Sequence, residues 1–86
     1  MLNLFVAHLT PGADPSQILS AETVSDTGAA VMTPAEAKAV GFGGLPQFPP
    51  GNVALIVVKT IDRGRILNSL EASPLVARFA MHDVDG

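Results

Sequence analysis

The 86-residue chain contains no cysteine. This absence excludes disulfide bonds, thiolate metal sites, iron–sulfur clusters and cysteine nucleophiles. Small domains obtain little net stability from their own packing, so many add a disulfide, a metal or a partner subunit. A partner subunit is the remaining option here, because no residue spacing typical of a metal site is present. We therefore expect a homodimer or a higher homo-oligomer.

Charged residues are also scarce. They make up 15% of the chain, compared with about 25% of a typical soluble domain, whereas 48% of the residues are apolar. Part of the apolar surface is therefore expected to be covered by another chain or by a ligand. The alternative is a well-packed monomer with an alanine-rich surface.

Basic residues are missing from the first 37 positions, which hold four carboxylates, and the net charge is −3. This half of the chain would repel nucleic acid, which is therefore not an expected partner. No apolar run is long enough for a signal peptide or a membrane span, and the first residues carry no basic side chain. We expect a cytoplasmic protein that makes no contact with a membrane.

Four segments have the residue pattern of β-strands. Residues 2–9 and 53–59 are apolar on both faces, which is typical of the central strands of a sheet. The segment 29–32 is short, and the side chains of residues 75–84 alternate between two faces, with one face more apolar than the other. We therefore expect the first pair at the centre of the sheet and the second pair at its edges.

Helix-start signals follow two of these strands. Asp14, with proline after it, predicts a short helix that ends near residue 22. Thr33 and Glu36 have the spacing of a capping box and predict a second short helix, closed by Gly41. A third helix is expected from Thr60 or Asp62 to a Ser-Pro pair at residues 73–74.

The predicted order of elements is strand, helix, strand, short helix, strand, helix, strand. It matches the ferredoxin-like split β-α-β pattern of the α+β class, with an inserted short helix and a Gly/Pro-rich loop between strands 2 and 3. Residues 1–86 are expected to form a single domain, because a second core has no room. A three-layer sheet with helices on both faces is the alternative.

The ferredoxin-like pattern places both main helices on one face of the sheet and leaves the other face open. Since the central strands are apolar on both faces, the open face is expected to form the subunit interface. The main core is expected to contain the following residues: Leu4, Phe5 or Val6, with Leu55, Ile56, Val57, Leu67, Leu70 and Phe79.

Positive charge is concentrated where strand 53–59 leads into the third helix. Lys59, Arg63 and Arg65 lie there together with Gly64, which would permit a close approach to the backbone. Free N–H groups at a helix start favour anions, so we expect a weak site for a small anionic ligand. Neither glycine-rich phosphate motif is present, and the alternative is a solvated helix start capped by Asp62.

The two histidines are candidates for acid–base chemistry. His8 and His82 lie toward opposite ends of antiparallel neighbouring strands, so His8 is expected near Arg78 instead, as a catalytic or anion-binding pair or as a structural residue. His82, Asp83 and Asp85 are metal ligands by type, but on a strand the two carboxylates point away from the imidazole. We predict no metal site and no cofactor.

Residues 41–52 contain four glycines and three prolines, so they can sustain neither a helix nor a ladder. Phe42, Leu45 and Phe48 lie in this loop. A loop of this length is a candidate lid or partner-binding arm. Alternatively, its apolar side chains close the end of the core.

The sequence contains no nucleophile elbow and no zinc-type spacing. We therefore predict a small homo-oligomeric binding or regulatory module with no catalytic residue, whose partner is a small anionic ligand or a protein. One alternative is a small cofactor-independent enzyme, of isomerase or oxygenase type, with a pocket between the sheet and the helices. The other is a structural or assembly protein of a larger particle. His8, Arg78 or Asp83 turned into a cavity, with a shifted pKa, would favour the enzyme.

Overall fold

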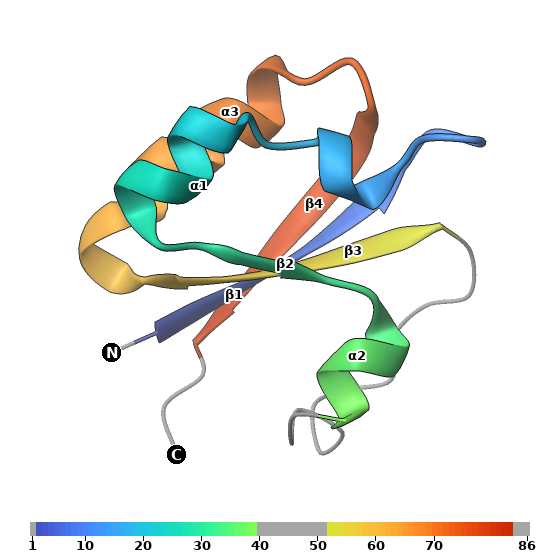
Figure 1. Ribbon diagram of the computed structural model, residues 1–86. Helices are drawn as coiled ribbons and strands as arrows, with labels where there is room; N and C mark the ends of the chain where they lie inside the picture. The colour runs from blue at the N-terminus through green and yellow to red at the C-terminus, as the bar shows by residue number, and fades with distance from the viewer. Residues whose placement is uncertain (1, 40–51, 84–86) are drawn as a thin grey trace.

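The structure is a computed structural model that describes residues 2–39 and 52–83 (Figure 1). These residues form an α+β structure with a four-stranded antiparallel sheet in the order β2-β3-β1-β4. The strands are β1 (Leu2–Leu9), β2 (Ala30–Met32), β3 (Val53–Lys59) and β4 (Val76–Asp83). The two strands that are apolar on both faces, β1 and β3, are therefore central, as the sequence predicts.

One predicted helix is wrong. Instead of a helix that ends near residue 22, the chain forms a 3₁₀ turn, η1 (Pro15–Gln17), and then a separate helix, α1 (Ala21–Thr27). Ile18 and Leu19, between them, are both buried, so the chain turns toward the core there. A second N-cap starts α1, because the Ser20 side chain accepts a hydrogen bond from the Thr23 N–H.

The second helix, α2 (Pro34–Ala39), begins at the predicted capping box. The Thr33 N–H donates to Glu36 Oε1 at 3.1 Å, and the Glu36 N–H donates to Thr33 Oγ1 at 3.2 Å. Gly41, the expected stop, lies outside the described residues, as do Phe42, Leu45 and Phe48 of the Gly/Pro-rich segment.

The third helix differs at its start. Strand β3 continues into a 3₁₀ turn, η3 (Thr60–Asp62), and then into α3 (Arg63–Ala72). Neither η3 nor α3 receives a side-chain cap, so the expected cap from Thr60 or Asp62 is not formed. The Arg63 N–H instead donates to the Thr60 carbonyl, which tightens the entry into α3. The predicted end at residue 73 is confirmed.

The core lies on both faces of β1 and β3. Helices α1 and α3 lie side by side over one face, the helical face, where Phe5, Ile56 and Leu70 are buried (Figure 1). The opposite face, the α2 face, carries a second cluster of buried residues: Leu4, Val6, Val53 and Leu55 with Ala37 of α2. Of the expected core, Val57, Leu67 and Phe79 are only partly buried.

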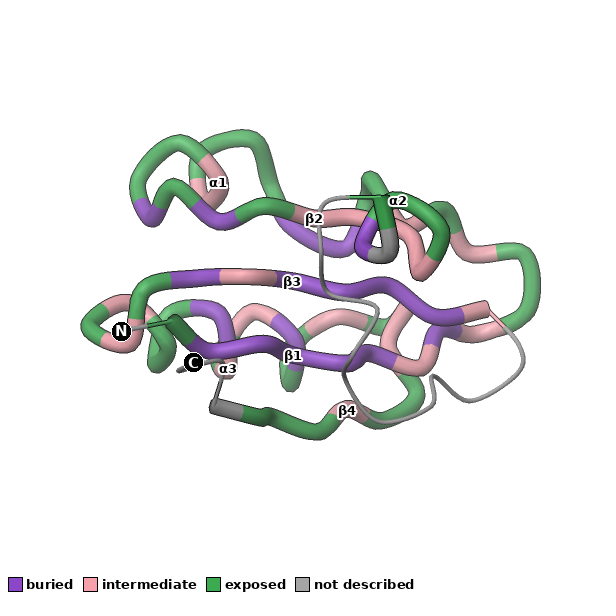
Figure 2. Tube along the Cα trace, turned by 90° about the horizontal axis from the view of Figure 1, so that it is seen from below, coloured by how far each residue is buried: buried purple, intermediate pink, exposed green. Residues whose placement is uncertain are grey.

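The α2 face is therefore not open at its centre. Leu4 retains 1% and Leu55 0% of its accessible surface within the single chain. Figure 2 shows the same distribution, with burial along β1 and β3 and exposure along most of β4. The expectation that this face is left for a partner subunit is wrong at these residues.

In the described part of the chain, no helix is long and apolar enough to cross a membrane.

Candidate functional site

A cavity of about 390 Å³ lies beside β2, where η1, α1 and the start of α2 meet. We call it the β2 cavity. Its polar lining consists of Asp14, Ser16, Thr33 and Glu36. Its apolar lining consists of Pro15, Val24, Val31 and Met32. Three of the four polar residues are exposed, so the polar groups lie toward solvent.

The apolar lining of the β2 cavity includes side chains from both faces of the sheet at its edge. Strand side chains alternate between faces. Val31 therefore packs with Val24 against the core of the helical face, whereas Met32 packs against the core of the α2 face. Strand β2 is an edge strand, so no further strand lies beyond it. The partly buried side chains of Val24, Val31 and Met32 line the cavity at this edge.

The Asp14 carboxylate is fixed by the turn that follows it. Its Oδ1 accepts from the Ser16 N–H at 3.0 Å and from the Ser16 hydroxyl at 2.9 Å. These two hydrogen bonds, the backbone one first, hold the pKa of Asp14 below its ordinary value of 3.8, against a small opposing effect of desolvation. Asp14 therefore carries a full negative charge at neutral pH.

Glu36 is fixed in the same manner by the capping box. Its Oε1 accepts from the Thr33 N–H, and this bond orients the carboxylate at the first turn of α2. The β2 cavity thus contains two carboxylates, each held by a hydrogen bond from a backbone N–H at the start of a short helical segment. The described part of its lining contains no lysine, arginine or histidine.

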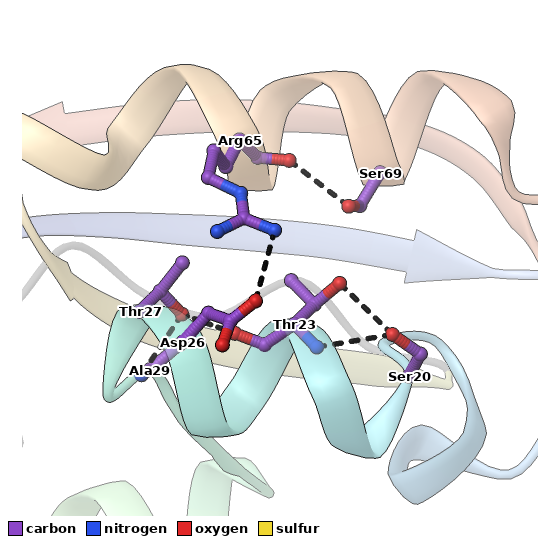
Figure 3. Close-up of polar contacts among 7 residues, drawn as sticks. All are labelled: Ser20, Thr23, Asp26, Thr27, Ala29, Arg65 and Ser69. Carbon is purple, nitrogen blue, oxygen red and sulfur yellow. Dashed lines mark hydrogen bonds and ion pairs between the residues drawn. The ribbon is translucent and has the colours of Figure 1, made fainter.

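The basic residues near α3 are brought only partly together. Lys59 and Arg63 are exposed, but Arg65 reaches across to α1, where its guanidinium lies 3.3 Å from Asp26 Oδ2 (Figure 3). The Arg63 N–H is already bonded to Thr60. A Cβ added at Gly64 would meet no atom within 4 Å. The space beside the backbone at residue 64 therefore does not depend on the residue being glycine. The anion site stays a prediction.

The register of the sheet places His8 directly opposite Arg78, so both side chains lie on one face, as the sequence suggests. His8 is half-buried and Arg78 is exposed. His82 lies opposite Leu4, away from His8. Neither histidine lines the β2 cavity. Among the described side chains, no group of three or more histidines and carboxylates could hold a metal ion, and Asp85 lies outside that part of the chain.

From the sequence, Asp14 and Glu36 are predicted only as parts of helix caps. Two features could have indicated a site. Both caps carry a carboxylate, and they flank a segment that ends in the short edge strand β2. The same segment lies within the 37 residues that contain no basic side chain. The cavity itself depends on how η1 folds back beside β2, and sequence spacing does not report that contact.

We compared the chain with protein-family models, with curated proteins and with solved structures, and none of them matches it.

Proposed function

We propose that this chain is a small binding or regulatory module that holds its ligand in the β2 cavity. The observation that carries this proposal is the shape and lining of the cavity. Sites for small ligands are concave, mostly apolar and about 300 to 1,000 Å³ in volume, with a few fixed polar groups. The β2 cavity has a volume of about 390 Å³, an apolar floor and two oriented carboxylates.

The same lining favours binding over catalysis. A general acid or base works best when its pKa lies near the operating pH. The pKa of Asp14 is instead lowered by Ser16, so this carboxylate does not exchange a proton near neutral pH. The isomerase or oxygenase alternative would need another group, and His8 and Arg78 lie outside the cavity lining. The assembly-protein alternative depends on extended contacts made by the segment 41–52, of which only residue 52 belongs to the described part of the chain.

We also propose that the fold is ferredoxin-like, with α2 as an insertion. Three features support this: the strand order β2-β3-β1-β4, the antiparallel pairing throughout, and the packing of α1 and α3 on one face of the sheet. Helix α2 follows β2 and packs through Ala37 on the opposite face.

We retain a homodimer as a proposal, but along a different surface. Since the centre of the α2 face is buried, the exposed edge strand β4 is the better candidate. It is eight residues long, and Ala77, Ala80 and Met81 are exposed on it. Long exposed edge strands tend to pair with another chain.

A titration followed by the amide signals of the isotope-labelled protein tests the binding proposal. A set of small neutral and charged fragments is expected to move the amides of residues 14–16, 24 and 31–36 together. Val24→Phe fills the cavity and should abolish these shifts. Ser25→Phe adds the same ring at the neighbouring exposed position of α1 and should leave them unchanged. Shifts grouped instead at residues 59–66 would contradict the proposal and favour the anion site.

A further inference from the structure

We infer that the ligand of the β2 cavity is an organic cation, with an ammonium or guanidinium group on a short apolar stem. This inference rests on the proposed binding function and specifies its ligand class. Among the residues that the structure describes, the charged groups that line the cavity are the carboxylates of Asp14 and Glu36, and none of these lining residues is cationic. An anion of the class expected from the sequence would be repelled here.

Both carboxylates retain the capacity to accept a further hydrogen bond. A carboxylate has two oxygens with about four acceptor positions. The two bonds to Asp14 described above both end on Oδ1, and the bond to Glu36 ends on Oε1. Because the caps already orient the two groups, a cation would bind without ordering them first, which lowers the entropic cost of binding.

The apolar floor defines the rest of the ligand. Val24, Val31 and Met32 offer methyl and thioether surface that cannot hydrogen-bond to a hydrated inorganic ion. Methylene groups, in contrast, gain free energy when they leave water against such a surface. The lining thus combines exposed carboxylates with partly buried aliphatic side chains, which favours an alkylated amine over ammonium or sodium ions.

This chemistry has two sources, a free amine and the side chain of a lysine or arginine in a peptide. The position of the cavity is compatible with both, because β2 is an edge strand and a peptide could run along its outer side. The probes are therefore n-butylammonium, n-butanol and n-butyrate, which share one stem and differ in charge. A blocked Val-Lys-Val tripeptide and its norleucine analogue form the peptide arm.

We expect n-butylammonium to shift the amides of residues 14–16 and 31–36 and to bind about three- to fivefold more tightly than n-butanol at low salt, as exposed ion pairs allow. The preference should shrink as salt is added. Asp14→Asn and Glu36→Gln should each remove much of it. Both amides still cap helical segments, so these variants should keep the fold. Glu71→Gln, on exposed α3, is the matched control and should bind like the parent.

The outcomes separate the ligand class from the site. Equal binding of n-butanol, or tighter binding of n-butyrate, would overturn the cationic ligand and leave the β2 cavity as a binding site. Failure of all three probes to move the cavity amides would overturn the site as well. If the lysine tripeptide binds more tightly than both n-butylammonium and its norleucine analogue and also moves residues 30–32, the cation belongs to a peptide. If it binds no better than n-butylammonium, the ligand is a free amine.

Discussion

At the scale of single residues, burial decides which leucines of α3 stabilise the fold. Leu70 retains 1% of its accessible surface in the core of the helical face, whereas Leu67 is only partly buried. Leu70→Ala is therefore expected to lower the free energy of unfolding by about 2 to 5 kcal/mol. Leu67→Ala, the matched control on the same helix, should cost roughly 1 kcal/mol. Denaturant titration measures both, and equal losses would contradict the assigned faces of α3.

The Asp14 carboxylate makes stability depend on pH. Its pKa in the folded protein is lowered below 3.8 by the two hydrogen bonds from Ser16. A lowered folded-state pKa means that the contribution is fully present above 3.8 and is lost as the pH falls through the folded pKa. Thermal unfolding of the parent and of Asp14→Asn between pH 6 and pH 2 tests this sign. The parent should lose stability relative to the variant below about pH 4.

If the difference in stability between the parent and Asp14→Asn stayed constant from pH 6 to pH 2, the lowered pKa of Asp14 would be contradicted. Glu36 lines the same cavity, but it is present in both proteins and so does not produce a difference between them. The comparison therefore isolates Asp14.

At the scale of elements, two glycines should respond in opposite directions. Gly28 ends α1 with a φ of 68°, in the left-handed region, so Gly28→Ala is expected to destabilise the protein by about 1 kcal/mol. Gly64 lies inside α3, and Gly64→Ala should stabilise by about 0.5 to 1 kcal/mol. An added Cβ meets no atom within 4 Å at either position, so only the backbone conformation differs.

Thermal unfolding of the two variants beside the parent protein measures this difference. Shifts of the same sign would show that the turn after α1, or the start of α3, is not as described.

Local sequence signals predict the elements whose causes are local. The capping box at Thr33, the apolar segment 53–59 and the Ser-Pro end of α3 are all where the sequence places them. The start signal at Asp14 is confirmed, because Asp14 caps η1, but the helix does not continue to residue 22. Ile18 and Leu19 are buried there, and this burial is a tertiary effect that local signals do not report. The β2 cavity was missed for the same reason, since its walls come from segments that meet only in the folded chain.

At the scale of the whole molecule, the edge strand β4 determines the expected assembly. Light scattering at high micromolar concentration should give about twice the 8.9 kDa mass of the chain. Ala80→Lys places a charge on exposed β4 and should return the mass to that of a monomer. Ala72→Lys, at the exposed end of α3, is the control and should leave the dimer intact. A monomeric parent would contradict the proposal.

The strand order also has a consequence for how the chain folds as it is synthesised. Strand β1 is made first, yet its two neighbours are β3 and β4, and Asn3 pairs with Asp83 near the other end of the chain. Contacts so distant in sequence slow folding. Until β3 leaves the ribosome, β1 is an unpaired strand with apolar side chains on both faces, a form that aggregates readily. The sheet therefore cannot close around β1 until β4, which supplies its second neighbour, has been synthesised.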